Sequence, residues 1–401
     1  MFEVADALAT VLSHSRPLEA EVAALSVAAL GQVLAADITA DADSPPFAKS
    51  LRDGYAVRSA DCASAGAELT VVEEVPAGKV PLKSVGTGEA ARIFTGAPIP
   101  DGADAVVMQE HTEKLGGGRV RIVDAGVKSR QWVYAQGAEM RAGAVVLAKG
   151  TPITPAACGV LASVGQTAVP AFPFPRVGVI VTGDEIVEAG TKPRPGQIRN
   201  SNGPMLTALT ARGGGRPRYL GIARDDRAVT ESLIREGLDV SDVVVIAGGM
   251  SVGDHDFVPE VLKELGVVIR FRQIRMKPGK PILFGTTEKG TLVFGLPGNP
   301  VSAFVGFELF VRPALRILGG HAEAGPRTIR LPLADGLAES TDRPTYRPAK
   351  LEPHATGWGV RPLTTTGSPD LVSTQRADAL LVLPAGNTRA DAGTLADVVL
   401  L

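Results

Sequence analysis

A run of five apolar residues at 243–247, four of them β-branched, constrains the fold more than any other feature of the sequence. A continuous apolar run of this length, ended by a turn signal, is typical of a strand that is buried on both faces of a parallel sheet. Gly248-Gly249 follows at once, and glycine permits both a tight turn and a close approach of a ligand to the backbone. We therefore expect a ligand at this strand end, because open α/β sheets bind ligands beyond the carboxyl ends of their strands.

Polar residues follow the glycine pair before the next helical pattern begins at 258–265. Ser251 offers a hydroxyl, and Asp254 and Asp256 offer two carboxylates. This order indicates a pocket for an anionic ligand with a metal ion. An ordinary strand-to-helix turn, in which the aspartates cap the helix, explains the same residues. The stretch alone leaves both interpretations open.

Strand-like and helix-like patterns alternate from residue 176 to residue 318. We expect strands at 176–182, 219–222, 243–247, 269–276 and 292–296, and helices at 202–212, 228–236, 258–265 and 301–318. Such alternation predicts a mostly parallel, doubly wound α/β sheet.

The flanking segments have other patterns. Residues 1–36 carry apolar residues at helical spacing, and we expect helices there. Residues 69–147 are short β-like runs separated by Gly and Pro, which predicts an all-β insert. A helix is expected at 151–170, with a capping threonine before a proline in its first turn. Beyond Gly319-Gly320, short apolar runs return and predict a small C-terminal β domain.

Composition excludes several classes of protein. The net charge of −2 over 401 residues gives no indication of a nucleic-acid or membrane partner. The two cysteines, Cys62 and Cys158, exclude a disulfide framework and a cysteine-based zinc site. No signal peptide is evident, and no apolar run reaches the roughly 18 residues of a membrane span. We expect a cytoplasmic protein.

Further carboxylates follow the other predicted strands. Glu185 follows the strand at 176–182, and Asp225 follows the strand at 219–222. With Asp254 and Asp256 they make four carboxylates on loops at one edge of the sheet. Clustered carboxylates repel one another unless a cation joins them, and hard oxygen ligands suit Mg²⁺. The group predicts a magnesium site, whereas each residue alone is explained as a helix cap or a surface charge.

Cationic residues stand between the last two strands of this region. In the segment 276–281, Lys277 and Lys280 are framed by two prolines and a glycine. Such framing favours a fixed clamp for an oxyanion or a phosphate over a solvated surface pair. The segment 297–302, a glycine turn that leads into a helix, is a second place where an anion is favoured.

These motifs together resemble a known family, the molybdopterin molybdenumtransferases, which comprise the bacterial MoeA proteins and the gephyrin E domain. The resemblance covers nearly the whole chain. The motifs that carry it lie at 53–57, 94–98, 102–107, 182–185, 196–202, 248–256, 277–281 and 297–302.

The resemblance implies α/β plus β architecture in four domains. These are an elongated mixed α/β first domain (1–43 and 138–170, for dimerisation), an all-β insert (44–137), a doubly wound MogA-like α/β domain that binds molybdopterin (171–320), and a C-terminal β-barrel-like domain (321–401). A homodimer is implied as well. The upstream molybdopterin adenylyltransferase and the cofactor-accepting enzymes are the further partners that the resemblance suggests, with no nucleic acid and no membrane.

The implied reaction inserts molybdate into adenylylated molybdopterin, releases AMP and is assisted by Mg²⁺. For this reaction we expect catalytic roles for Asp53, Glu185, Asp225 and Asp256. The magnesium ligands are the four carboxylates already predicted from the loops, Glu185, Asp225, Asp254 and Asp256. The resemblance assigns the molybdopterin nucleotide to Thr95, Gly248, Gly249, Ser251, Pro297, Gly298, Asn299 and Ser302. It assigns molybdate to Lys277, Lys280, Arg347 and Ser368, and places Asp53 and Thr95 in the pocket of the partner subunit.

The sequence departs from the family pattern at a few positions. They are Arg52 in place of Met, Tyr134 in place of Arg, Ala138-Glu139 in place of Glu-Asp, and Pro369 in place of His. The departures spare the loops of the α/β region. Two alternatives therefore stay beside the transferase: a non-catalytic molybdopterin-binding scaffold or chaperone, and an adenylyltransferase that acts one step earlier.

Overall fold

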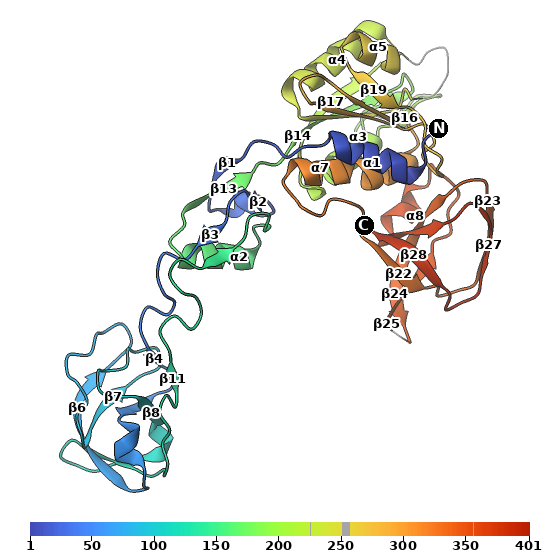
Figure 1. Cartoon of the computed structure of the whole chain (residues 1–401). Coiled ribbons are helices and arrows are strands. Elements are labelled where there is room, and N and C mark those ends of the chain that lie inside the picture. The colour runs from blue at the N-terminus through green and yellow to red at the C-terminus, as the bar shows by residue number, and fades with distance from the viewer. Residues whose placement is uncertain (225, 251–256, 356) are drawn as a thin grey trace. The chain divides into compact units, whose positions relative to one another are not determined.

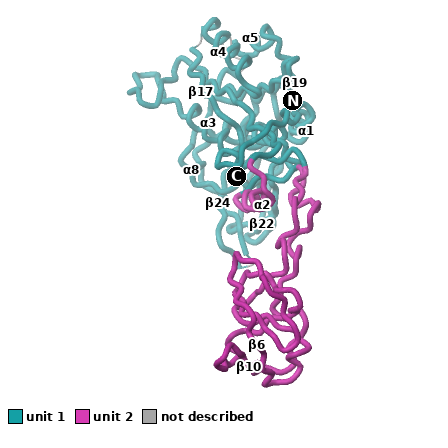
Figure 2. The backbone as a smooth tube through the Cα atoms, turned by 90° about the vertical axis from the view of Figure 1, so that its left-hand side faces the viewer, with its two compact units in different colours: residues 1–36, 150–154, 168–401 teal, residues 37–149, 155–167 magenta. Residues whose placement is uncertain are grey.

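The computed structural model describes residues 1–224, 226–250, 257–355 and 357–401 (Figure 1). It divides into two compact units, coloured separately in Figure 2. Unit 1 comprises residues 1–36, 150–154 and 168–401, and unit 2 comprises residues 37–149 and 155–167. This division is coarser than the four domains predicted from the sequence, whose bounds remain predictions. Each unit is described by itself.

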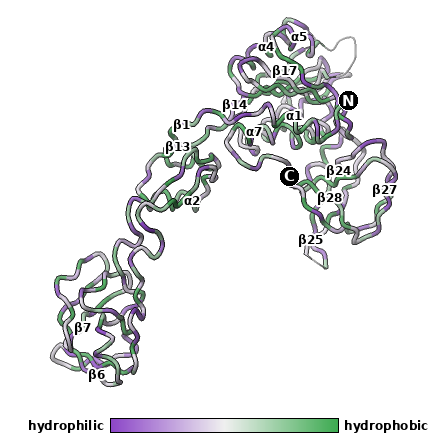
Figure 3. Tube along the Cα trace, in the orientation of Figure 1, coloured by the Kyte–Doolittle hydropathy of each residue, from purple (hydrophilic) through white to green (hydrophobic). Residues whose placement is uncertain are grey.

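A six-stranded sheet forms the centre of unit 1. Its order is β17 (Arg216–Ala223), β14 (Arg176–Thr182), β18 (Val243–Ala247), β21 (Leu292–Leu296), β20 (Leu283–Thr286) and β19 (Val268–Phe271). The first four strands are parallel, β20 runs antiparallel to β21, and β19 runs antiparallel to β20. Every residue of β18 is buried, as the apolar run predicted. Figure 3 shows hydrophobic residues gathered along the strands of this sheet.

Helices cover both faces of the sheet. Side chains of β18 alternate between two cores: Val243 and Val245 pack with α1 (Val4–His14) and α3 (Asn202–Arg212), whereas Val244 and Ile246 pack with α4 (Arg227–Val240) and α5 (Val258–Glu264). In Figure 1, α4 and α5 lie on one side of the sheet, and α1, α3 and α7 on the other. The predicted doubly wound arrangement is confirmed.

The helix expected at 301–318 has three parts. It begins as α6 (Pro300–Gly306), passes through a π-helical turn at Phe307–Val311, and continues as α7 (Arg312–Leu318). Its residues are almost all buried, so this predicted helix is part of the core of unit 1. No helix among the described residues is both long and apolar enough to span a membrane.

The prediction of a strand at 269–276 was wrong about where the strand ends. β19 ends at Phe271, and the unpredicted β20 lies at Leu283–Thr286. Both strands are added at one edge of the sheet by antiparallel pairing, β20 with β21 and β19 with β20. A four-residue strand that contains a glycine carries little local signal, and its pairing with β21 decides its structure.

The helical prediction for 1–36 holds only for α1. Residues beyond it form β1 (Glu21–Ala24), a 3₁₀ turn at Val27–Ala29 and β2 (Val33–Leu34). Both strands pair with β13 (Ala168–Phe172), which also shortens the helix expected at 151–170 to α2 (Pro155–Ser163). Pairing with a segment distant in sequence overrides local helical spacing here.

Unit 2 contains a second six-stranded sheet. Its order is β8 (Ala105–Met108), β5 (Gly54–Val57), β7 (Glu89–Ile93), β6 (Ala67–Val75), β10 (Arg119–Ile122) and β9 (Thr112–Lys114). Two short pairs accompany it: β4 (Lys49–Ser50) with β11 (Val133–Tyr134), and β3 (Ile38–Thr39) with β12 (Val145–Leu147). These strands confirm the β-rich character expected for residues 69–147.

The C-terminal segment of unit 1 forms two sheets. The larger has the order β22 (Thr328–Pro332), β28 (Leu395–Leu400), β26 (Ala379–Leu383), β24 (Thr345–His354) and β25 (Gly357–Pro362), and the smaller pairs β23 (Leu337–Thr341) with β27 (Gly386–Ala390). A short helix, α8, spans Leu371–Gln375. Tyr346, Leu380 and Val399 join the same core as α1 and α7, so this segment packs against the α/β part of unit 1.

Candidate oxyanion and nucleotide site

Three strand-end loops meet at the carboxyl edge of the parallel sheet. Gly248, after β18, has a φ of +97°, and its N–H donates a 3.0 Å hydrogen bond to the carbonyl of Leu296 in β21. A Cβ atom at Gly248 would lie 2.6 Å from the carbonyl oxygen of Thr182 in β14. A Cβ atom at Gly298 would lie 3.7 Å from the Cα of Gly248. Glycine at 248 therefore lets the ends of β14, β18 and β21 approach one another.

A cavity of about 270 Å³ opens beside these loops. Gly298 and Asn299, two of the predicted nucleotide-binding residues, line it together with Asn202. Asn202 is only 6% exposed, and its Nδ2 donates a 2.7 Å hydrogen bond to the carbonyl of Gly298. Its Oδ1 has no hydrogen-bond partner among the described residues. The cavity therefore offers a buried acceptor for a ligand N–H or O–H group.

Glu185 is the one predicted magnesium ligand that the structure describes. It is exposed in the loop between β14 and β15 (Ile186–Val187). A Cβ atom at Gly183 would lie 2.5 Å from its Oε2, so the carboxylate folds back over that glycine. Asp225, Ser251, Asp254 and Asp256 lie outside the described residues. Within the described part of the chain, no three His, Cys, Asp or Glu residues form a group that could hold a metal ion.

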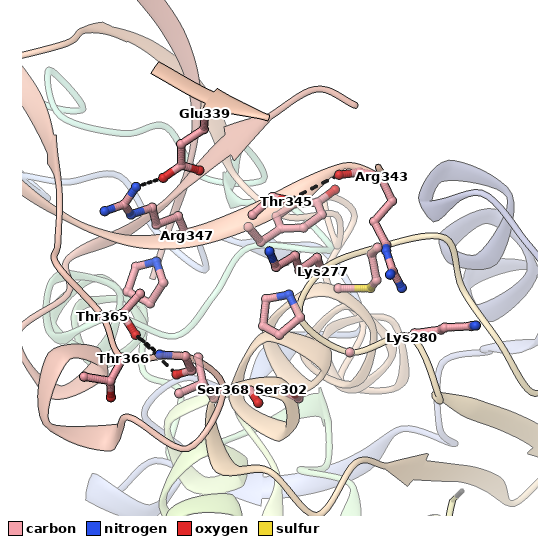
Figure 4. Close-up of a pocket in the computed structure, with 17 residues that line it drawn as sticks. Lys277, Lys280, Ser302, Glu339, Arg343, Thr345, Arg347, Thr365, Thr366 and Ser368 are labelled. Atoms are coloured by element: carbon pink, nitrogen blue, oxygen red, sulfur yellow. Dashed lines mark hydrogen bonds and ion pairs between the residues drawn. The ribbon is translucent and has the colours of Figure 1, made fainter. Parts of the chain in front are cut away.

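A second cavity, of about 540 Å³, lies between the lysine segment, the start of α6 and the C-terminal sheets (Figure 4). All four residues predicted to bind molybdate line this cavity, and the predicted nucleotide ligand Ser302 lines it too. These residues are Lys277, Lys280, Arg347, Ser368 and Ser302. Segments far apart in the sequence thus bring cations and hydroxyl groups to one place.

Backbone hydrogen bonds fix the lysine segment. The N–H of Lys277 donates to the carbonyl of Pro344 (2.8 Å), and the N–H of Tyr346 donates to the carbonyl of Lys277 (2.7 Å). The N–H of Ile274 closes the segment by donating to the carbonyl of Lys280 (2.9 Å). Both lysine side chains are exposed, and neither forms an ion pair with another residue drawn in Figure 4. Their amines are therefore available to an anion.

The two arginines of the cavity already hold carboxylates. Arg343 pairs with Asp342 at 2.9 Å. The Nη1 of Arg347 forms an ion pair with Glu339, and its Nε donates a 3.1 Å hydrogen bond to the carbonyl of Leu363. Partial burial lowers the pKa of Arg347 from its usual value. The sequence did not indicate Arg343 or Glu339, because their position beside the lysines depends on how β23 and β24 fold back.

The loop that carries Ser368 is held at both ends. Asp370 accepts hydrogen bonds from the N–H groups of Thr366 (3.0 Å) and Ser373 (3.1 Å). These backbone bonds, first that of Thr366, lower the pKa of Asp370 to about 2. The N–H of Val301 in α6 donates to the carbonyl of Ser368 (3.0 Å). Ser368 is thereby fixed next to the start of α6.

Asp53 and Thr95 lie in unit 2 and contact each other. One carboxylate oxygen of Asp53 accepts hydrogen bonds from both the N–H and the hydroxyl of Thr95, each 2.8 Å long. The backbone bond, followed by the hydroxyl bond, lowers the pKa of Asp53. The two residues predicted to reach the pocket of the partner subunit thus contact each other.

Three of the residues that depart from the family pattern, Arg52, Tyr134 and Glu139, make contacts within unit 2. The guanidinium of Arg52 stacks on the ring of Trp132, 4.7 Å from its centroid. The ring of Tyr134 lies 5.3 Å from the amine of Lys49. Glu139 accepts a 2.7 Å hydrogen bond from the hydroxyl of Ser44. Cation–π stacking and hydrogen bonding therefore accommodate the substituted side chains locally.

Comparisons with known proteins show the family to which the chain belongs. The model of the MoeA N-terminal region (domain I and II) matches residues 2–165, that of a probable molybdopterin binding domain matches residues 178–317, and that of the MoeA C-terminal region (domain IV) matches residues 330–401. The chain is 35% identical over 401 residues to the molybdopterin molybdenumtransferase of Staphylococcus aureus strain Mu50, which covers 99% of this chain and 95% of the relative.

A relative of the same name from Staphylococcus epidermidis ATCC 12228 is 36% identical over 375 residues, covering 92% of this chain and 89% of the relative. The crystal structure of the molybdopterin biosynthesis MoeA protein from Pyrococcus horikoshii OT3 superimposes with a TM-score of 0.85 at 31% identity, covering 100% of both chains. The chain therefore belongs to the MoeA family, the family of the molybdopterin molybdenumtransferases.

Proposed function

We propose that this chain inserts molybdate into adenylylated molybdopterin and releases AMP. The observation that carries the proposal is the cavity in which Lys277, Lys280, Arg347 and Ser368 come together. The relatives' name, molybdopterin molybdenumtransferase, supports a transferase that acts on molybdopterin and molybdenum.

The oxyanion cavity has the chemistry that molybdate requires. Molybdate is a tetrahedral dianion, and the exposed amines of Lys277 and Lys280 supply two positive charges. Ser302 and Ser368 add hydroxyl groups that donate to oxyanion oxygens. Charge-assisted hydrogen bonds of this kind orient the anion as well as bind it. The protein's contribution to the reaction is accordingly positioning and electrostatic stabilisation.

The molybdopterin nucleotide is proposed to bind at the strand ends. Gly248 and Gly249 leave the backbone open there, and the smaller cavity presents Gly298 and Asn299. Pro297 is buried just before them, and Ser302 lines the oxyanion cavity from α6, the helix that follows these residues. Ser251 is proposed for the same pocket on the strength of the sequence alone. This placement joins the nucleotide to the oxyanion cavity through α6.

Magnesium is the proposed assisting ion, with Glu185, Asp225, Asp254 and Asp256 as its ligands. Glu185 provides an exposed carboxylate, the oxygen donor that Mg²⁺ prefers. The ion would offset negative charge on the phosphate as the anhydride bond breaks. Asp256→Asn tests this role, because Asn caps a helix about as well as Asp but lacks the charge. Loss of AMP release with an intact fold is expected, whereas full activity would return Asp256 to a capping role.

A homodimer is proposed to complete the site, with Asp53 and Thr95 supplied by the partner subunit. Light scattering that shows a monomer at micromolar concentration would contradict it. The upstream adenylyltransferase and the cofactor-accepting enzymes are the further proposed partners, and the cytoplasm is the proposed location.

One assay tests the reaction itself. Purified chain is mixed with adenylylated molybdopterin and Mg²⁺, and AMP is measured with and without molybdate. AMP release that depends on molybdate is expected. Binding of the nucleotide without AMP release would instead indicate a non-catalytic scaffold, and an absolute need for ATP would indicate an adenylyltransferase.

A further inference from the structure

We propose that Glu339 is an internal competitor of the oxyanion: its carboxylate and the tetrahedral anion bind the guanidinium of Arg347 in turn. The inference rests on the proposed function, because it takes the cavity of Lys277 and Arg347 to be the oxyanion site. Glu339 lines that cavity and forms its ion pair with the Nη1 of Arg347. Figure 4 shows the guanidinium of Arg347 turned toward Glu339.

The two side chains come from different sheets. Arg347 lies on β24, where it pairs with Leu381 of β26, and its Nε is held by the carbonyl of Leu363. Glu339 lies on β23, opposite Thr388 of β27. The guanidinium is therefore anchored independently of Glu339, so it can keep its place when the carboxylate leaves.

Exposure allows the carboxylate to leave. The side chain of Glu339 is 29% exposed and that of Arg347 is 20% exposed. A carboxylate with this access to water is rehydrated when it gives up its partner, so the exchange does not leave a bare buried charge. The oxyanion can therefore still enter the cavity, but its affinity is lowered by the free energy of breaking the Glu339–Arg347 ion pair.

The remaining charges of the cavity favour an exchange, in which the oxyanion replaces Glu339 on Arg347, over binding that leaves the Glu339–Arg347 pair intact. Arg343 is held by Asp342, and the two lysine amines have no such partner among the residues in Figure 4. A tetrahedral oxyanion has oxygens on several sides, so it gains from contacting the lysines and Arg347 together. To bind the N–H of Arg347 Nη1 that Glu339 holds, the oxyanion must replace that carboxylate, since both are anions that accept from the same donor.

The alternative to exchange is that Glu339 stays on Arg347 and repels the incoming anion. The two cases predict different effects on affinity when the charge of Glu339 is removed. If Glu339 leaves, every oxyanion loses the same ion-pair energy, so removing the charge raises all affinities by one factor. If Glu339 stays and repels, the gain scales with ligand charge, and the factor for a dianion is the square of that for a monoanion. Molybdate and perrhenate, tetrahedral anions of charge −2 and −1, separate the two cases.

The experiment measures the Kd of molybdate and of perrhenate by calorimetry on the full chain at constant ionic strength. Glu339→Gln keeps the size of the side chain and removes its charge. We expect both anions to bind about tenfold more tightly to this variant, the effect of losing one partly exposed charge-assisted bond. Equal or weaker binding would overturn the proposal, as would a squared factor for molybdate.

Glu352→Gln is the matched control. Glu352 lies on β24, its side chain is also 29% exposed, and it pairs with Arg361 outside the cavity. Its substitution is expected to leave both affinities unchanged, and its thermal midpoint serves as a reference for folding.

A second variant distinguishes an error in the proposed function from an error in the role of Glu339. If a Lys277→Ala/Lys280→Ala double variant binds molybdate as well as the parent does, the cavity is not the oxyanion site. If the lysines matter and Glu339→Gln does not tighten binding, only the role of Glu339 is wrong.

Discussion

The side-chain amide of Asn202 donates a 2.7 Å hydrogen bond to the carbonyl oxygen of Gly298. This bond ties the start of α3, which follows the strand β16 (Ile198–Arg199), to the loop after β21. Asn202 is almost fully buried, and a buried amide that loses such a partner leaves an unsatisfied carbonyl. The nucleotide side of the site is thus built from loops fixed to one another, which is the preorganisation that binding a charged ligand requires.

Gly248→Ala tests how tightly these loops approach. Alanine there meets two penalties: a φ of +97° and a contact of 2.6 Å with the carbonyl of Thr182. We expect a loss of about 2–5 kcal/mol in the free energy of unfolding, from backbone strain and overpacking together. Calorimetry of the thermal transition measures it.

Gly266→Ala is the control for backbone strain alone. Gly266 has a φ of +81°, and a Cβ atom there would have nothing within 4 Å. Its substitution is expected to cost about 1–2 kcal/mol. Equal losses in the two variants would show that the approach of Gly248 to Thr182 carries no energetic weight.

The strand β18 and its glycine turn were predictable because both signals are local. A continuous apolar run can be buried on two faces, and a glycine pair marks the turn that ends it. The second half of residues 1–36 was not predictable in the same way, since β1 and β2 exist only by pairing with β13. Local spacing contains no information about a partner so far away in sequence.

The residues of the candidate site were likewise predictable from the sequence only where the signal is local. Lys277 and Lys280 were singled out by their proline and glycine frame, which is local. Arg347 and Ser368 came from the family resemblance, and the structure shows that they share one cavity with the lysines. Glu339 was missed because an acidic residue in a short strand is ordinary. Only the folding of β23 over β24 brings it to Arg347.

Lys277→Ala and Lys280→Ala should each weaken the use of molybdate more than the binding of the nucleotide. Each removes one charge from the oxyanion cavity, and a charge-assisted hydrogen bond at an exposed amine is worth about tenfold in affinity. The measurement is the molybdate concentration that gives half-maximal AMP release, compared with the nucleotide Kd. Lys289→Ala, an exposed lysine outside the cavity, should change neither.

Asp370→Ala should also raise the molybdate requirement, although Asp370 is not expected to touch the anion. Its carboxylate holds the N–H groups of Thr366 and Ser373, and so shapes the loop that carries Ser368. The half-saturating molybdate concentration is expected to rise several-fold, with a smaller rise for Asp370→Asn because Asn still accepts a hydrogen bond. Since the pKa of Asp370 is about 2, the loop should keep its order down to about pH 4.

Asp226→Ala is the matched control for this loop. Asp226 caps α4 by accepting a 2.9 Å hydrogen bond from the N–H of Val229, and it does not line the oxyanion cavity. Losing this cap should cost about 1 kcal/mol of stability and leave the molybdate requirement unchanged. If Asp370→Ala behaves like Asp226→Ala in both respects, the loop does not organise the site.

His321 should make unit 1 sensitive to mild acid. Burial, then the positive charges of Arg316 and Arg327, lowers the pKa of its imidazole to about 4. The ordinary value near 6.5 applies to the unfolded chain, which therefore binds more protons between pH 6.5 and pH 4. Stability should decline as the pH falls through this window, by about 1–3 kcal/mol once partial exposure is allowed for.

His321→Gln removes the titrating group, so its thermal midpoint should fall less between pH 7 and pH 5 than that of the parent chain. His111→Gln is the control, because the ring of His111 lies 2.9 Å from a carboxylate, that of Asp124. The control should keep the decline of the parent. Parallel curves for His321→Gln and the parent would mean that proton uptake elsewhere causes the acid sensitivity and that the imidazole is free to become charged in the folded protein.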